Sequence, residues 1–180
     1  MKKVLLAMVL SMLAVAAYAG SVDLVPGAIT VVPSTVFILE YIVTDVGPVE
    51  SAGLRLTFDP ALVHVLGVAE GEYIAQQYPP DSPAMLGGWN NMAGTLNVTV
   101  TRYGPNTSSG SGTAMIVTFH CEGLGVATLS FYAGVSDPDG NKLAIKGGKV
   151  VVSQLVPEPM TLALIGAALT ALGLVARKRS

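Results

Sequence analysis

The chain has 180 residues, 51% of them hydrophobic, and a formal net charge of −2. Residues 20–156 hold eleven of the twelve acidic side chains but only five of the ten basic ones, so this part carries a formal charge of −6. Nucleic-acid binding depends on lysine and arginine side chains that neutralise phosphates. An acidic core with no basic stripe therefore argues against DNA or RNA as a partner.

The first residues, MKKVLLAMVLSMLAVAAYAG, have the three parts of a secretory signal peptide. Two lysines precede an apolar run that is too short to span a bilayer comfortably, and the run ends in the small-x-small sequence Ala-Tyr-Ala. We predict a signal peptide over residues 1–19, cleaved between Ala19 and Gly20, and hence an exported protein. The alternative is an N-terminal anchor that is not cleaved.

The middle of the chain is predicted to be all β. Residues 36–43, VFILEYIV, are almost continuously apolar, as in a strand largely covered on both faces. Residues 54–58, 96–102, 115–120 and 127–132 instead alternate apolar and polar side chains, as in strands with one wet face. The side chains expected to point into the core are Leu54, Leu56, Phe58, Leu96, Val98, Val100, Val117, Phe119, Leu129 and Phe131.

Turn-forming residues separate these strands. They lie at residues 46–48, 90–94, 106–112, 137–141 and 147–148. No amphipathic helical stretch of useful length lies between the two ends, and many short strands with frequent turns indicate an antiparallel β-sandwich. A chain of about 135 residues can bury a core in one domain. The single cysteine, Cys121, is expected to be a buried apolar side chain, with no internal disulfide.

The order of these runs and turns resembles a cohesin domain over about residues 22–153. The resemblance is strongest in LTFDPALVHVLGV, with its strand, Asp-Pro turn and further strand, and in GTAMIVTFHCEGLGVATLSF, where a Gly-rich link joins two strands. It implies a nine-stranded jelly-roll β-sandwich over residues 20–153. It also implies a non-catalytic receptor for dockerin modules on other proteins, in a superfamily that contains cellulose-binding modules as well.

The same resemblance places the partner-binding face on one sheet, which includes the strands at 53–58 and 95–102. The side chains that would point outward from these strands belong to Arg55, Thr57, Asn97, Thr99 and Thr101. The competing interpretation is a solvated polar face that binds nothing, because resemblance of fold alone does not establish a partner.

Residues 70–94 form a long connection rich in proline and amides, and it holds Tyr73, Tyr78 and the only tryptophan, Trp89. Aromatic faces beside amides are what a sugar-binding groove uses, so the alternative function is a carbohydrate-binding module that attaches to extracellular polysaccharide. The competing interpretation is that Trp89 packs as an anchor beneath the connection, since single aromatics in a sandwich are usually core residues. A structural matrix protein with no specific ligand is a third possibility.

Catalysis finds little support in the sequence. Only His64 and His120 could act as general bases near neutral pH, and no catalytic motif accompanies them. His120 and Cys121 are adjacent on a predicted strand, so their side chains should leave from opposite faces and cannot form a dyad. Each histidine is expected to be structural or on the surface, and the protein is not expected to be an enzyme.

A metal site is also disfavoured, and no cofactor is expected. Asp137, Asp139 and Asn141 have the spacing that begins a calcium loop. Lys142 and Gly148, however, stand where such a loop requires glycine and glutamate. The sequence Asp-Pro-Asp-Gly fits a tight β-turn, which is the favoured interpretation.

The C-terminus resembles a PEP-CTERM sorting signal, in which a Pro-Glu-Pro motif, an uncharged span and a basic triplet follow one another. The motif residues are Pro157, Glu158, Pro159, Arg177, Lys178 and Arg179. As a helix the seventeen-residue span would reach roughly 25 Å, slightly short of a ~30 Å hydrocarbon core, and the basic triplet would hold the C-terminus in the cytoplasm. We predict a linker over residues 154–159, a transmembrane helix over 160–176 and a tail over 177–180.

This second resemblance implies processing near Pro-Glu-Pro by a membrane enzyme, an exosortase. It further implies a location at the cell surface or in the extracellular matrix of a Gram-negative bacterium. The alternative is a plain membrane anchor, since Ala163, Ala167 and Ala171 have the small-xxx-small spacing of paired helices. Sorting is favoured because a plain anchor has no need of the Pro-Glu-Pro motif.

Overall fold

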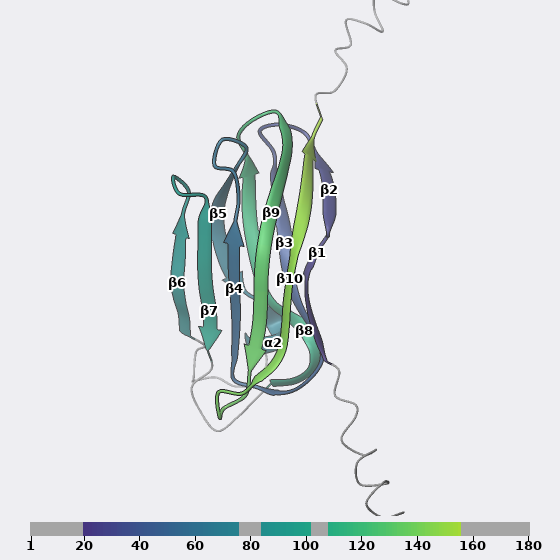
Figure 1. The fold of residues 1–180 in the computed structure, drawn as a ribbon, viewed down its shortest axis with the longest axis vertical. Helices are drawn as coiled ribbons and strands as arrows, with labels where there is room; N and C mark the ends of the chain where they lie inside the picture. Colours follow the sequence, from purple (N-terminus) through teal and green to yellow (C-terminus); the bar gives the residue numbers. More distant parts are fainter. Residues whose placement is uncertain (1–19, 76–83, 102–107, 156–180) are drawn as a thin grey trace, which may run out of the picture.

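Alternating apolar side chains give each strand one face to bury, and two sheets bury these faces against each other. The computed structural model describes residues 20–75, 84–101 and 108–155 (Figure 1). One sheet has four strands in the order β1 (Ser21–Val25), β3 (Val36–Val49), β8 (Ser108–Cys121) and β5 (Val63–Glu70). A single helical turn, α2 (Glu72–Ala75), follows β5.

The second sheet has six strands and faces the viewer in Figure 1. Their order is β2 (Ala28–Val31), β10 (Lys142–Gln154), β9 (Gly125–Ser136), β4 (Ser51–Thr57), β7 (Thr95–Thr101) and β6 (Ala84–Asn90). Neighbouring strands are antiparallel in both sheets, except that β2 runs parallel to β10. The expected jelly-roll-like β-sandwich is therefore confirmed.

The core lies between the sheets and contains every side chain that the sequence placed there. Near the start of β3 and the end of β8, an aromatic contact joins the two sheets. Phe119 of β8 stacks on Phe37 of β3 with ring centroids 5.2 Å apart, and it meets Phe58, which follows β4, edge to face at 6.0 Å. Aromatic pairs in these geometries stabilise a core beyond the area that they bury.

The number of strands differs by one from the nine expected. The described residues contain ten strands, because the first segment is divided at Pro26 and Gly27. Pro26 has no N–H to donate, so strand pairing is interrupted there. Before the break β1 pairs with β3, and after it β2 pairs with β10 of the other sheet.

The prediction that residues 36–43 form a strand covered on both faces was wrong. Phe37, Leu39 and Tyr41 are buried, but Val36 is 56% exposed and Ile38 is 48% exposed. The reason is that β3 lies inside the four-stranded sheet, and no described strand or helix covers the outer face of that sheet. A continuous apolar run here forms a strand with one buried face.

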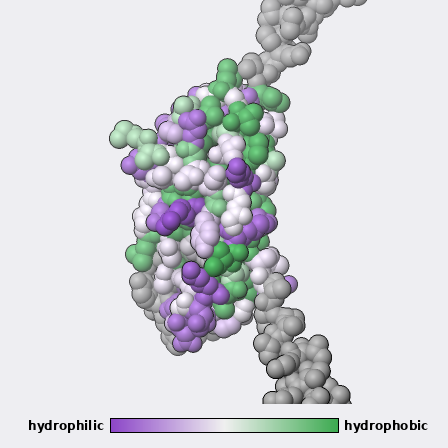
Figure 2. All heavy atoms as spheres, in the orientation of Figure 1, coloured by the Kyte–Doolittle hydropathy of each residue, from purple (hydrophilic) through white to green (hydrophobic). Residues whose placement is uncertain are grey.

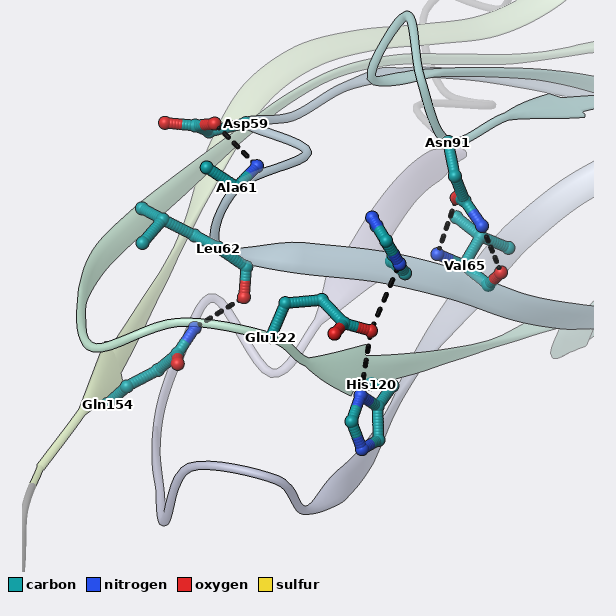
Figure 3. Close-up of polar contacts among 9 residues, drawn as sticks. Asp59, Ala61, Leu62, Val65, Asn91, His120, Glu122 and Gln154 are labelled. Carbon is teal, nitrogen blue, oxygen red and sulfur yellow. Dashed lines mark hydrogen bonds and ion pairs between the residues drawn. The ribbon is translucent and has the colours of Figure 1, made fainter.

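Part of the long connection at 70–94 is a strand that the sequence analysis missed. β6 forms the edge of the six-stranded sheet and pairs with β7. The turn after β6 holds Asn91, whose side-chain amide accepts a hydrogen bond from the N–H of Val65 (2.9 Å) and donates one to its carbonyl (3.0 Å). Asn91 thereby pairs exposed backbone groups of the edge strand β5, as Figure 3 shows.

The predicted signal peptide, the tail from residue 156 onward and Tyr78 lie outside the described residues. Strand β10 extends to Gln154, one residue beyond the expected domain boundary, and the N–H of Leu155 still donates to the carbonyl of Val31. Within the described ranges, no helix has the length and apolar character needed to cross a membrane.

Replacement of Phe119 by alanine tests the aromatic contact between the sheets. We expect Phe119→Ala to lower the free energy of unfolding by about 3–5 kcal/mol, because it removes a fully buried ring and leaves a cavity. Denaturant titration of residues 20–155 measures the loss. The control Leu66→Ala, at a side chain that is 54% exposed, should change stability by no more than about 0.5 kcal/mol. Equal losses would contradict this account of the core.

Candidate functional site

A hollow of about 300 Å³ opens on the outer face of the six-stranded sheet. Strands β4, β7, β9 and β10 line it. Because directly opposed residues in an antiparallel pair project to the same side, the strand register shows which side chains surround the hollow. Tyr132, Arg55 and Asn97 form one row across β9, β4 and β7. Ser136 and Ser51 form a parallel row four residues away along the strands, and their hydroxyls lie 2.6 Å apart.

Two glycines create the hollow between these rows. Gly53 of β4 and Gly134 of β9 are direct partners in the sheet and lie between the two rows. On these two strands, therefore, no side chain projects into the space between the rows. A Cβ atom built on either glycine would meet no atom closer than 3.5 Å, and neither residue has a positive φ. Neither glycine is required by backbone conformation or by close packing. A larger side chain at either position would project into the hollow and fill it.

The walls combine two cations with polar and apolar surface. Arg55 and Lys142 line the hollow, and neither forms an ion pair with a described residue. Tyr132 and Ile145 contribute exposed aromatic and aliphatic surface, 51% and 46% exposed. A guanidinium offers five N–H donors in a fixed fork and suits carboxylate or carbonyl oxygens. The hollow therefore suits a partner that presents such oxygens beside an apolar side chain.

The structure places the five residues predicted for partner binding on one face. Arg55, Asn97 and Thr99 line the hollow together. Thr57 lies further along β4 beyond the Arg55 row, and Thr101 lies opposite Ser51 at the other side of the hollow. Period-two alternation was sufficient to bring these five side chains to a common face.

Sequence reasoning missed the part of the hollow that comes from β9 and β10. Tyr132 could have been found, because Phe131 was expected to point inward and its neighbour must then point outward. Lys142 and Ile145 could not, because the pairing of β9 with β10 shifts register between Lys142 and Ala144. Such a shift breaks the period-two pattern on which the assignment of faces depends.

Of the aromatic residues of the sugar-binding alternative, the two that the structure describes, Tyr73 and Trp89, do not form one exposed platform. Trp89 pairs with Leu96, a core residue, so it projects from the face of the sheet opposite the hollow. The expectation that Trp89 packs as an anchor beneath a long connection was wrong, since β6 is an edge strand and leaves the ring 43% exposed. Tyr73 is buried, and burial raises the pKa of its hydroxyl.

The two histidines meet on the outer face of the other sheet. His64 of β5 and His120 of β8 are direct partners, and Glu122 contacts both; Figure 3 shows its contact with His120. Its Oε1 atom is 2.9 Å from Nδ1 of His120 and 3.0 Å from Nδ1 of His64. The hydrogen bond from His120, with the nearby charge of His64, lowers the pKa of Glu122.

The expected separation of His120 from Cys121 is confirmed. Cys121 is fully buried, which raises the pKa of its thiol, whereas His120 lies on the outer side of the same strand. Among the residues that the structure describes, no three histidine, cysteine or acidic side chains are arranged to hold a metal ion.

The segment from Asp137 to Asn141 forms the predicted β-turn. The N–H of Gly140, at φ +80°, donates to the carbonyl of Asp137 at 3.0 Å. The carboxylate of Asp137 accepts hydrogen bonds from the backbone and the side-chain amide of Asn141, at 2.7 and 2.9 Å, and these bonds contribute to the lowered pKa of Asp137. The carboxylate thus stabilises the hairpin between β9 and β10.

Comparisons with known proteins define the fold. No family model matches the sequence, and no curated protein matches it either. Among solved structures, the chain is similar to a type I cohesin in complex with a dockerin from Clostridium thermocellum. The TM-score is 0.60 at 14% sequence identity, and the match covers 75% of this chain and 99% of that chain. It is also similar to a non-cellulosomal cohesin from the archaeon Archaeoglobus fulgidus, with a TM-score of 0.56 and 15% identity over 80% and 96% of the two chains.

A third similar structure is a type II cohesin dyad from the adaptor scaffoldin ScaA of Acetivibrio cellulolyticus. Its TM-score is 0.60 at 11% identity, and the match covers 77% of this chain and 49% of the dyad. The described part of the chain therefore has the cohesin fold.

The Glu122 contact predicts a pH-dependent contribution to stability. Because the pKa of Glu122 is lower in the folded chain, its ionised form stabilises the fold above its usual pKa of 4.5, and this contribution disappears as the pH falls through the lower folded value. We expect Glu122→Gln to lower Tm at neutral pH and to have no effect in strong acid. Thermal unfolding followed by circular dichroism, with Glu50→Gln as the surface control, measures this. A loss that persists unchanged in strong acid would contradict the assignment.

Proposed function

We propose that residues 20–155 form a non-catalytic docking module that binds a partner protein across the outer face of the six-stranded sheet. The observation that carries the proposal is the hollow over Gly53 and Gly134, with the unpaired cation of Arg55 in its wall. The cohesin fold supports a docking role, because two of the similar structures are described as cohesins in complex with dockerins. By this analogy the partner is a dockerin-like module on another protein.

The surface around the hollow has the composition of a binding site. Arginine and tyrosine are the side chains most often responsible for binding energy at protein interfaces, and here Arg55 and Tyr132 are neighbours on adjacent strands. Leu86 of β6 is exposed, lies opposite Thr99 and extends the same face with apolar surface. A polar face that carries such side chains favours the docking interpretation over a solvated face that binds nothing.

The alternative, a module for extracellular polysaccharide, retains one supporting observation. Trp89 is partly exposed and could stack on a sugar ring, but it stands on the other face of its sheet from the hollow. Tyr73 has no open face to contribute because it is buried. A protein partner is therefore the better-supported interpretation.

We further propose that the chain is exported and sorted through its ends. Residues 1–19 would direct export, with cleavage after Ala19, and residues 160–176 would hold the module at the membrane. An exosortase would then act near Pro157, Glu158 and Pro159 and leave the module at the cell surface or in the extracellular matrix. The order of motif, uncharged span and basic triplet supports this proposal.

A pull-down with immobilised residues 20–155 from the extracellular fraction of the source organism tests the docking face. We expect wild-type protein to retain a partner protein, and Gly53→Thr to weaken retention by about tenfold or more, because the new side chain fills the hollow. Arg55→Ala should weaken it by a similar factor. The matched control is Gly67→Thr in β5 of the other sheet, where a Cβ meets nothing within 4 Å.

The same experiment separates the two functions. If polysaccharide is retained instead, and Trp89→Ala abolishes retention while Gly53→Thr does not, the carbohydrate alternative replaces the docking proposal. Retention that survives both Gly53→Thr and Arg55→Ala would contradict the proposed face, whatever the partner.

The sorting proposal predicts where the chain is cut. We expect the protein recovered from outside the cell to lack residues 177–180, because processing near Pro-Glu-Pro removes the whole C-terminal span. Mass spectrometry of the intact extracellular protein measures this. The control is the membrane fraction, in which the unprocessed chain should still carry the basic triplet. An extracellular form that retains residues 177–180 would refute the proposal.

A further inference from the structure

The most exposed apolar side chains of the described chain gather at one end of the sandwich. The five large hydrophobic residues with the greatest exposure, between 56% and 92%, are Val36, Met92, Leu124, Val126 and Leu155. They come from separate elements, but the topology brings all of these elements to the same end.

The strand register locates this end. Val126 lies at the start of β9, opposite Ser153 near the finish of β10, and Leu155 follows directly after β10. Leu124 lies in the link from β8 to β9, and Val36 begins β3 opposite His120 at the finish of β8. Figure 2 shows apolar surface where β10 leaves the sandwich and mainly hydrophilic surface at the opposite end.

Charged side chains are few at this apolar end and more numerous at the opposite end of the sandwich. In the turns and strand ends described here, the apolar end has no lysine or arginine, and its acidic residues are Asp59 and Glu122. Both are already bonded, Asp59 to the N–H of Ala61 at 2.9 Å and Glu122 to the two histidines. Most of the acidic residues that the structure describes lie toward the far end, namely Asp45, Glu50, Glu70, Glu72, Asp137 and Asp139.

The chain leaves the sandwich at this apolar end, directly after β10. Only four residues separate Leu155 from the uncharged span that begins at residue 160, and two of them are prolines. Five residue steps extend at most about 18 Å, so a membrane that held residues 160–176 would lie within reach of Leu155. Prolines also favour an extended, stiff linker that limits tumbling of the sandwich.

We infer that this apolar end is a lipid-facing surface, which seats the sandwich on the membrane while the C-terminal span anchors the chain. The inference rests on the membrane anchor proposed above and adds a defined orientation. Exposed aliphatic side chains gain from entering the headgroup boundary, and a short tether holds them there. In this orientation the strands stand on the membrane and the acidic end points away from anionic lipids.

Site-directed labelling of the full chain, inserted into preformed vesicles of phosphatidylcholine and phosphatidylglycerol, tests this orientation. Cys121 is buried, so a thiol-reactive fluorophore should select a cysteine placed at Leu124→Cys or, as the control at the far end, at Asp139→Cys. We expect aqueous iodide to quench the label at position 124 roughly threefold less than the label at 139, because the headgroup boundary excludes the anion.

A second pair of variants removes any effect of the fluorophore at position 124. With the label at Val32→Cys, which lies in the loop between β2 and β3 at the same end, Leu124→Glu should restore quenching, whereas Ile145→Glu on the sheet face should not. Equal quenching at 124 and 139 in chains that float with the vesicles and resist alkaline extraction would overturn the orientation and leave the anchor intact. Shielding lost on dilution in excess lipid would show that a second copy covers this end, which also overturns it. Chains that fail to float would refute the anchor and the inference together.

Discussion

The architecture depends on one constraint, the burial of one face of each sheet against the other without a disulfide bond. The only cysteine is free and buried, and the rings of Phe37, Phe58 and Phe119 meet between the two sheets. Burial of every second side chain fixes which residues point outward. The outer faces and the two ends of the sandwich are the surfaces left for function.

The two outer faces differ in the side chains that they expose. The four-stranded sheet leaves Val36 and Ile38 exposed and carries the His64–Glu122–His120 contact. The six-stranded sheet carries the hollow, in which backbone forms the floor because two glycines face each other. Binding energy at protein interfaces is concentrated in a few side chains that lie in pockets, which is why this face is the one proposed for docking.

Sequence periodicity accounts for the core and for the residues that share the proposed docking face. Arg55, Asn97 and Thr99 were found because strands with one wet face alternate regularly. The hollow itself could not be predicted, since it arises from the pairing of Gly53 with Gly134, eighty-one positions apart. Local sequence patterns do not determine which residues of two such distant strands become partners. β6 was missed because Gly87 and Gly88 interrupt any alternation in AMLGGWN. The apolar run at 36–43 led to a wrong prediction of burial. Continuous hydrophobicity does not distinguish a strand buried on both faces from a strand that has one buried and one exposed apolar face.

The most direct test of the central claim is an NMR footprint of residues 20–155 against the partner protein recovered from the extracellular fraction. Backbone amide shifts, followed as that protein is titrated in, report where it makes contact. The account predicts the largest changes around Arg55, Asn97 and Tyr132, on three neighbouring strands of one face. Changes concentrated at Ile38, Leu66 and His64, with the six-stranded sheet unaffected, would show that the chain docks through its other face and would contradict the account.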